Sequence, residues 1–424
     1  MDDQSRVSLE QLMTAMAAKA KAGAEALRLA GPEVRTQAIL EAAKAIRARE
    51  AQILAANAED QAGAKAKGLT DAMIERLILN PARVEAMAKG LEEVAALPDP
   101  VGKELARWTR PNGLDIARVS TPIGVIAIIY ESRPNVTADA AALCIRSSNA
   151  AILRTGSEAL NSALAIYAAF EDGFKAAGLP SSCVQLVPTS DRDAVGLILG
   201  GLNGAINLII PRGGRSLVER VQKEARAPVL AHLEGLNHTY VHSAADPKKA
   251  VEVTVNAKMR RVSVCGATET LLIDEAVAGK LLPEIAKALE AKGCELRGDA
   301  AAQAIYPMKA ATEEDWRTEY LLPIISIRVV QDEAEAIAHI KTYGSGHTEA
   351  IITEDTAAAE TFLNEVDSAI VLWNASTQYA DGGEFGLGAE IGISTDRLHA
   401  RGPVGAEQLT TFKYIVRGTG QTRP

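Results

Sequence analysis

The sequence has few aromatic residues and no surplus of positive charge. Only 4% of its 424 residues are aromatic, and the formal net charge is -9. Proteins that bind nucleic acid usually carry a basic surplus, and many stack aromatic rings on the bases. We therefore expect no nucleic-acid partner, and an anionic ligand would need a local basic pocket.

Long apolar runs are also missing from the sequence. No uninterrupted run reaches the length that a membrane-spanning helix needs. The first residues, Met-Asp-Asp-Gln-Ser, lack the basic region and following apolar stretch of a secretory signal. We expect a cytoplasmic protein without a membrane partner.

The four cysteines form no Cys-x-x-Cys pair and no tight cluster with histidine in the sequence. This pattern argues against a disulfide framework and against a structural zinc site. His232, His238 and His242 come closest to metal-ligand spacing, but they fall in a strand-like stretch, so we expect no metal. Three cysteines are expected to be packing residues: Cys144, Cys183 and Cys294.

The apolar residues, 47% of the chain, follow two successive patterns. Residues 8–95 have one-face helical spacing, whereas from residue 123 short apolar runs alternate with helix-like segments. Strands that alternate with helices are typical of a parallel sheet covered by helices, so the fold class is α/β, with a second α/β domain beyond Asp246. The expected strands include residues 124–130, 150–153, 184–187, 205–210, 229–233, 268–273, 324–330 and 350–353.

The fourth cysteine, Cys265, lies between a helix-like and a strand-like segment. A thiol at its ordinary pKa is only a few per cent thiolate near neutrality, so a nucleophile there would need nearby cations or amide donors. Lys258, Arg260 and Arg261 precede it and can supply positive charge. The alternative is a small buried hydrophobic residue, and the spacing alone leaves both possibilities open.

Two turns in the alternating region are candidates for phosphate binding. Residues 153–158 and residues 210–216 each follow an expected strand and precede an expected helix, where backbone amides attract anions. Neither is a Gly-x-Gly-x-x-Gly motif. Two ordinary turns with solvated arginines remain the alternative.

Several longer motifs occur together in this chain: residues 130–137 (Tyr-Glu-Ser-Arg-Pro-Asn-Val-Thr), 343–350 (Tyr-Gly-Ser-Gly-His-Thr-Glu-Ala), 381–392, 399–403 and the stretch around Cys265. With these motifs the chain resembles the gamma-glutamyl phosphate reductase family of the aldehyde dehydrogenase superfamily. The resemblance extends from the first helices to about Gln421.

The resemblance implies NADPH-dependent reduction of L-glutamyl 5-phosphate to L-glutamate 5-semialdehyde with release of phosphate, the second step of proline biosynthesis from glutamate. Cys265 would form a thioester, and Asn135 with the Cys265 backbone N–H would stabilise the oxyanion. Asn135 as a turn former after Pro134 is the alternative. Two other functions stay open: a non-phosphorylating aldehyde dehydrogenase that uses Glu234 as base, and a catalytically silent nucleotide-binding or scaffolding protein.

The same resemblance implies binding residues. Arg154, whose charge suits a 2′-phosphate, would lie near the adenosine ribose, and Glu319 would hold the nicotinamide ribose. The full cofactor set is Arg154, Ser157, Glu158, Pro211, Arg212, Gly213, Gly214 and Glu319. The candidates for the glutamyl and phosphate groups are Arg133, Lys258, Arg261, Glu384, His399 and Arg401. Four positions depart from the family pattern: Thr155, Asn237, Val262 and Gly266.

The resemblance also implies three structural units and a homo-oligomer. An NADPH-binding domain would comprise residues 1–108, 123–241 and about 368–398, and a catalytic domain residues 242–367. A hairpin of residues 109–122 would pair with the tail, residues 399–424, as an oligomerisation element. Glutamate 5-kinase is a possible partner, because it would make the acyl phosphate.

Overall fold

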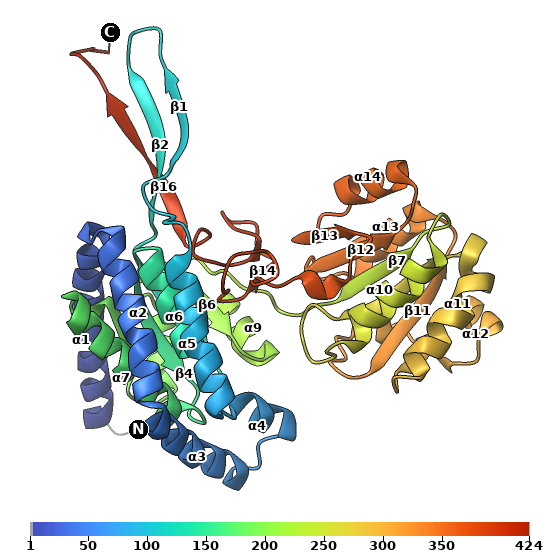
Figure 1. The fold of residues 1–424 in the computed structure, drawn as a ribbon, viewed down its shortest axis with the longest axis horizontal. Coiled ribbons are helices and arrows are strands. Elements are labelled where there is room, and N and C mark those ends of the chain that lie inside the picture. Colours follow the sequence, from blue (N-terminus) through green and yellow to red (C-terminus); the bar gives the residue numbers. More distant parts are fainter. Residues whose placement is uncertain (1–2, 424) are drawn as a thin grey trace.

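The computed structural model describes residues 3–423, except for the side chains of residues 3–6, 71 and 72. It contains two α/β bodies and a narrow sheet that projects from the first body (Figure 1). No helix within the described residues is long and apolar enough to cross a membrane.

The first body has a parallel four-stranded sheet in the order β5-β4-β3-β6. Five helices precede the sheet: α1 (Asp3–Leu29), α2 (Pro32–Ala48), α3 (Glu50–Ala66), α4 (Asp71–Leu77) and α5 (Pro81–Ala96). The alternating part then comprises β3 (Val125–Tyr130), α6 (Val136–Arg146), β4 (Ala150–Thr155), α7 (Leu160–Ala177), η1 (Ser181–Cys183), β5 (Val184–Leu186), α8 (Asp193–Leu199), β6 (Leu208–Arg212) and α9 (Arg215–Glu224).

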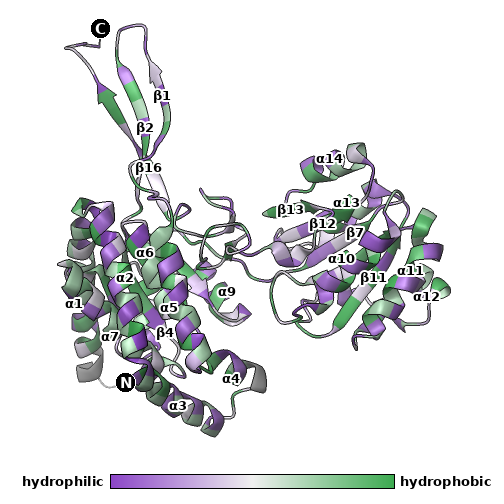
Figure 2. Cartoon of the chain, in the orientation of Figure 1, coloured by the Kyte–Doolittle hydropathy of each residue, from purple (hydrophilic) through white to green (hydrophobic). Residues whose placement is uncertain are grey.

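Helices cover both faces of this sheet, which explains its continuous apolar strands. In β3, Ile126 and Ile128 pack into a core with α2, α5, α6 and α7. Ala127 and Ile129 point to the other face, into a core with α1, α8 and α9. The helices carry both hydrophilic and hydrophobic bands, as helices packed on one side do (Figure 2).

The second body is built on a parallel seven-stranded sheet in the order β10-β9-β11-β8-β7-β12-β13. Helices α10, α11 and α12 pack on one face, and α13 and α14 on the other. Its elements are β7 (Asn237–Val241), α10 (Pro247–Met259), β8 (Thr268–Asp274), α11 (Glu275–Glu290), β9 (Glu295–Gly298), α12 (Ala300–Ile305), β10 (Lys309–Ala310), η2 (Asp315–Arg317), β11 (Ile324–Val330), α13 (Glu333–Tyr343), β12 (Thr348–Ile352), α14 (Thr356–Glu365), β13 (Ile370–Trp373) and η3 (Thr377–Tyr379).

The projecting sheet is antiparallel and joins distant parts of the chain. Its strands are β1 (Glu104–Thr109), β2 (Asp115–Pro122) and β16 (Thr410–Arg417), with β2 in the middle. The segment between the second body and β16 contributes a short two-stranded sheet, β14 (Ile393–Ser394) and β15 (Gly402–Pro403).

Several expected boundaries differ from the structure. β7 and β13, placed in the NADPH-binding domain by the expected limits, hydrogen-bond to β12 and belong to the seven-stranded sheet. Part of residues 399–409, expected in the oligomerisation element, is buried in the core of the first body through Ala400, Val404 and Leu409. The hairpin begins before residue 109, since β1 starts at Glu104. The strand expected at residues 229–233 is reduced to one bridge, between Ile209 and Val229.

Candidate active site

A cavity of about 710 Å³ contains Cys265 and is lined by segments of both bodies. From the first body come the end of β6, the start of α9 and Arg76 of α4. From the second come the loops before β7 and β8, the segment after η2, and Gln378. Seven arginines line the cavity: Arg76, Arg133, Arg212, Arg215, Arg260, Arg261 and Arg317. The arginines outnumber the five carboxylates of the lining, so the cavity is net positive in a chain of net negative charge, which suits an anionic ligand.

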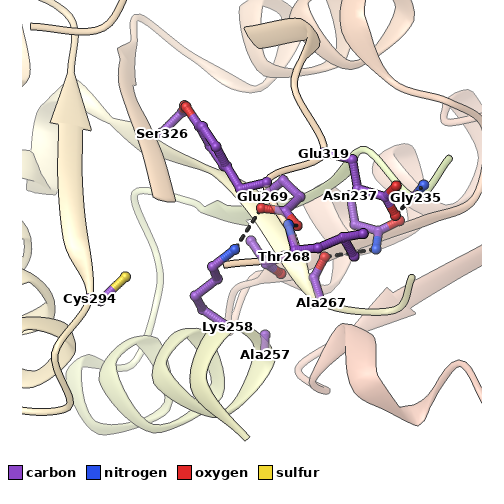
Figure 3. A network of polar contacts seen from close by, with 12 residues as sticks. Gly235, Asn237, Ala257, Lys258, Ala267, Thr268, Glu269, Cys294, Glu319 and Ser326 are labelled. Atoms are coloured by element: carbon purple, nitrogen blue, oxygen red, sulfur yellow. Dashed lines mark hydrogen bonds and ion pairs between the residues drawn. The ribbon is translucent and has the colours of Figure 1, made fainter. Parts of the chain in front are cut away.

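The loop that carries Cys265 is fixed by its neighbours. Asn237, at the start of β7, donates its side-chain amide to the carbonyl oxygen of Cys265 at 2.5 Å. It also donates to the carbonyl oxygen of Ala267 at 2.9 Å (Figure 3). The same side chain accepts a hydrogen bond from the backbone N–H of Thr348 at 3.1 Å. One buried amide therefore joins the cysteine loop to the start of β12.

Two histidines face the sulfur of Cys265. One nitrogen of His232, one nitrogen of His347 and the sulfur all lie within 4.8 Å of one another. Burial opposes ionisation of the thiol, but the charge and hydrogen bonding of the two imidazoles outweigh it, so the pKa of Cys265 lies well below its ordinary value. Cys265 can therefore be a thiolate at neutral pH.

Two carboxylates complete the cavity near the sulfur. Glu319 accepts a hydrogen bond from the backbone N–H of Gly235 at 3.0 Å. Glu390 accepts one from the backbone N–H of Gly382 at 2.9 Å. Burial is the main cause that raises the pKa of each carboxyl group above its usual value.

Comparison with known proteins identifies the family. The model of the aldehyde dehydrogenase family matches residues 4–304 and 307–394. Gamma-glutamyl phosphate reductase from Caulobacter sp. is 68% identical over 99% of this chain and 100% of its own, and that from Caulobacter vibrioides is 70% identical over 97% and 100%. The chain belongs to the gamma-glutamyl phosphate reductases of the aldehyde dehydrogenase family.

Solved structures agree with this membership. The gamma-glutamyl phosphate reductase of Thermotoga maritima, at 44% identity, has a TM-score of 0.94 over 97% of this chain and 100% of its own. A glyceraldehyde-3-phosphate dehydrogenase of Methanocaldococcus jannaschii, solved with NADP, has a TM-score of 0.69 at 18% identity over 97% and 95%, and shows the shared fold. The recognition of the family and of the α/β fold from sequence motifs is confirmed.

The structure of this gamma-glutamyl phosphate reductase family member places the expected cofactor residues in two groups. Pro211, Arg212, Gly213, Gly214 and Glu319 line the cavity with Cys265. Arg154, in β4, and Ser157 and Glu158, after β4, lie outside its lining.

The second cofactor group makes contacts within the protein. Arg154 is buried and donates to the carbonyl oxygens of Ser190 and Asp191 at 3.1 and 3.4 Å. Glu158 accepts hydrogen bonds from the backbone N–H and the hydroxyl of Ser132 at 2.6 and 3.0 Å.

Asn135 is exposed at the start of α6 and lies outside the lining of the cavity. Its side-chain amide donates to Asp139 at 3.0 Å. Burial raises the pKa of Asp139 to about 6, partly opposed by this hydrogen bond and by Arg212. In this conformation Asn135 is engaged with Asp139, and its role towards an oxyanion stays a prediction.

The six expected substrate residues do not form one group. Arg133 and Arg261 line the cavity, and burial lowers the pKa of Arg133 to about 10. Glu384 is exposed, His399 contacts the carbonyl oxygen of Gln408 at 2.8 Å, and Arg401 pairs with Asp367 at 2.5 Å. These three residues lie outside the lining of the cavity.

Lys258, expected to bind substrate, lies outside the lining of the cavity. Its side chain is fully buried and pairs with Glu269 at 2.6 Å, below the sheet surface (Figure 3). Desolvation is the main cause that raises the pKa of Glu269, in spite of the nearby lysine. A lysine held in this way supports the fold rather than a ligand.

Sequence analysis missed the two histidines beside Cys265. His232 was considered only with His238 and His242, yet His238 pairs with Glu349 at 2.9 Å and His242 with Thr353 at 2.8 Å. His347 stood in a motif used for the family resemblance and was given no role. The sequence feature that could have pointed to His347 is its position between a glycine-containing turn and an apolar strand.

Proposed function

We propose that the protein reduces L-glutamyl 5-phosphate to L-glutamate 5-semialdehyde with release of phosphate, using NADPH. This is the second step of proline biosynthesis from glutamate. The observation that supports the proposal most directly is a cysteine with a depressed pKa in an arginine-lined cavity. Gamma-glutamyl phosphate reductases that cover essentially the whole chain at 68% and 70% identity support the same activity.

In the proposed reaction the thiolate of Cys265 attacks the acyl carbon of the substrate. The bond between this carbon and the phosphate oxygen breaks, and phosphate, a good leaving group, departs with the electron pair. The arginines of the cavity, Arg133 and Arg261 among them, offset the negative charge of the phosphate. The product on the protein would be a thioester at Cys265, and a nicotinamide cofactor, when bound, would supply the hydride for its reduction.

The residues at the start of α9 fit the phosphates of such a cofactor. Gly213, Gly214 and Arg215 line the cavity, and no side chain caps the first amides of this ten-residue helix. The N–H of Gly214 itself donates to Glu131 at 3.1 Å, which leaves the amides that follow it for a ligand. Such amides at a helix start, with glycines that allow close approach, are a common dinucleotide site. The Nε atom of Arg212 is buried without a hydrogen-bond partner among the described residues, so it can serve a ligand.

A preference for NADPH over NADH would come from Arg154. Its charge interacts with those of Glu158 and Glu131 and, less strongly, with those of Arg192 and Arg220, so three arginines and two carboxylates meet near the end of β4. Its Nε atom and the nearby Thr155 hydroxyl are buried without partners among the described residues. Such a cluster suits the 2′-phosphate that distinguishes NADPH.

The alternative, a non-phosphorylating dehydrogenase, would need Glu234 to activate water. Glu234 lines the cavity, but its carboxylate pairs with Arg215 at 3.3 Å. A reductase that releases phosphate has no use for a base at this position. We therefore favour the phosphate-dependent reaction and treat Glu234 as a charge partner of α9.

Three further features belong to the proposal. The projecting sheet of β1, β2 and β16 would join a second copy of the chain, since Trp108, Phe412 and Tyr414 are exposed on it. A glutamate 5-kinase would supply the acyl phosphate. The reaction would take place in the cytoplasm, where the four free cysteines stay reduced.

The test follows the reverse reaction, the reduction of NADP by purified protein given glutamate 5-semialdehyde. We expect turnover only when inorganic phosphate is present, and none in Cys265→Ala. The matched control is Cys294→Ala, because Cys294 is a buried cysteine in the core of the second body. Cys294→Ala is expected to keep its activity.

Other outcomes would change the assignment. Turnover without phosphate, lost in Glu234→Gln, would support the hydrolytic dehydrogenase instead. Activity that survives in Cys265→Ala would refute the thioester. A comparison of kcat/KM for NADPH and NADH in wild type and Arg154→Ala tests the cofactor preference separately.

A further inference from the structure

The two imidazoles beside Cys265 come from segments far apart in the chain. His232 lies in the loop before β7, and His347 directly precedes β12. Their rings meet edge to face, with centroids 5.1 Å apart and planes at 74°. Because one nitrogen of each ring and the sulfur lie within 4.8 Å of one another, both rings can act on the same thiol.

The protonation of His232 is constrained by its other contact. Its Nδ1 lies 2.7 Å from the carbonyl oxygen of Ile393, which can only accept a hydrogen bond. Nδ1 therefore carries a hydrogen, and in the neutral ring Nε2 has the free lone pair. This leaves Nε2 as the atom that can take the proton of Cys265. Burial opposes protonation, but the hydrogen bond and charge of Cys265 outweigh it and raise the pKa of His232 above its ordinary value.

His347 is held by a hydroxyl instead of a carbonyl. Its Nδ1 lies 2.8 Å from Oγ1 of Thr348, an atom that can donate as well as accept. The side chain is fully buried, and its Nε2 has no hydrogen-bond partner among the described residues. An N–H at this buried position needs an acceptor, and the thiolate of Cys265, which lies within 4.8 Å of one nitrogen of this ring, can serve as one.

We propose that His232 is the base that ionises Cys265 and that His347 donates its Nε2–H to the resulting thiolate. This inference deepens the proposed function and rests on it for the chemistry. The thiol proton moves to Nε2 of His232, which gives a thiolate and an imidazolium. The thiolate bonds to the acyl carbon, and phosphate leaves with the electron pair of the broken C–O bond and takes up a proton from water.

The same pair acts again when the product leaves. After hydride has reached the thioester carbon, the C–S bond breaks and its electron pair returns to sulfur. The thiolate re-forms beside the imidazolium of His232 and the N–H of His347. The nucleophile is thus restored in its ionised form, without a separate deprotonation in each turnover.

Other charged groups also face the sulfur and affect how the ionisation of Cys265 depends on pH. Glu319 and Glu390 are carboxylates on the cavity wall, and both interact with the charge of Cys265. The positive charge of Arg133 is stabilised by the negative charge of the Cys265 thiolate. Arg212 and Arg261 line the same cavity. The groups that lower the pKa of the thiol most are the two histidines.

The experiment measures how fast iodoacetamide alkylates Cys265 as a function of pH, read by mass spectrometry of the peptide that contains it. His232→Asn keeps a side-chain N–H near the Ile393 carbonyl but removes Nε2. An ordinary thiol has a pKa of about 8.5 and is about 3% thiolate at pH 7. We expect the midpoint in His232→Asn to rise towards that value, with alkylation about thirty-fold slower at pH 7 and recovered at pH 9.

His347 is tested with two variants. His347→Asn removes the donor beside the sulfur, whereas the longer amide in His347→Gln can replace it. We expect a raised midpoint in His347→Asn and partial rescue in His347→Gln. Thermal melting of each variant shows whether it is folded, and a merely structural role would not move the midpoint of alkylation.

The outcomes separate this inference from the proposed activity, because alkylation requires neither substrate nor cofactor. Midpoints in His232→Asn and His347→Asn that equal the wild-type midpoint would overturn the inference, even if the reductase activity is found. A rise of about one pH unit or more in both would support it, even if the substrate proves to be another acyl phosphate.

Discussion

Gly235 packs directly against the backbone of Cys265. A Cβ atom built at position 235 would overlap the carbonyl oxygen of Cys265 and lie only 3.0 Å from its Cα. The backbone N–H of Gly235 also donates to Glu319 at 3.0 Å. Glycine at position 235 therefore allows the loop before β7 to lie directly against the backbone of Cys265.

The first prediction concerns this contact. Gly235→Ala must displace the Cys265 backbone, and we expect kcat to fall at least about ten-fold, since small misplacements of reacting groups are costly. The control is Gly279→Ala in α11, where a Cβ meets nothing within 4 Å. That variant is expected to keep full activity and to gain up to about 1 kcal/mol of stability. Equal kcat values in the two variants would contradict the prediction.

The second prediction separates the basic residues expected to bind substrate. Arg261 lines the cavity, whereas Arg401 pairs with Asp367 outside it. We expect Arg261→Ala to lower kcat/KM for the acyl phosphate by about ten- to a hundred-fold, as the loss of a charged hydrogen bond does. Arg401→Ala should change kcat/KM by less than about three-fold. Steady-state kinetics on both variants test this prediction. A larger loss of kcat/KM in Arg401→Ala than in Arg261→Ala would place the substrate outside this cavity.

The third prediction concerns the buried pair of Lys258 and Glu269. Loss of one partner leaves a buried charge without compensation, so Lys258→Met should lower the free energy of unfolding by about 3–5 kcal/mol. Lys258→Met combined with Glu269→Leu should recover most of this loss. The exposed pair of Lys248 and Glu252 is the control, and Lys248→Met should cost less than about 0.5 kcal/mol. Denaturant unfolding measures the free energy of unfolding of the three variants. A double variant as unstable as Lys258→Met would contradict the prediction that the unpaired Glu269 causes the loss.

The fourth prediction is a pH dependence of stability at Asp315. Burial alone would raise the pKa of this carboxyl group, but hydrogen bonds from Tyr320, Arg297 and Thr312 hold it well below its ordinary value. A depressed pKa contributes stability above the unfolded value of about 3.9, and this contribution is lost as the pH falls towards the folded value.

We therefore expect Asp315→Asn to be less stable than wild type by about 1–3 kcal/mol at pH 7. The difference should narrow as the pH falls below about 4. Glu284→Gln, at an exposed position of α11, controls for the loss of one negative charge. Urea unfolding at several pH values tests this, and a difference that grows towards acid pH would contradict it.

The short sequence motifs pointed to several residues that the structure brings together. Cys265, residues 211–214 and Glu319 each lie in or beside a short motif, and all line one cavity. Local spacing is enough there, because a strand, a turn and the start of a helix fix the direction of the side chains. The alternation of strands and helices also predicted the parallel sheets correctly.

The parts that depend on distant contacts could not be predicted. His232 and His347 meet only because β7 and β12 are neighbours in the sheet, an order that the sequence pattern does not reveal. Lys258 was assigned to the substrate because it stands near Cys265 in the sequence. Its partner Glu269 lies in β8, next to the end of α10, which carries Lys258. The pattern of charges in the sequence does not show that this pair is buried.

The side chain of Asn237 fixes the geometry around Cys265 from within the second body. It ties the Cys265 loop and the amide of Thr348, next to His347, to a single point on β7. Asn237 and Thr348 belong to neighbouring strands of one sheet, and the Cys265 loop leads directly into β8 of the same sheet. The sulfur of Cys265 is thus preassembled with one of its two histidines by contacts that the first body does not supply.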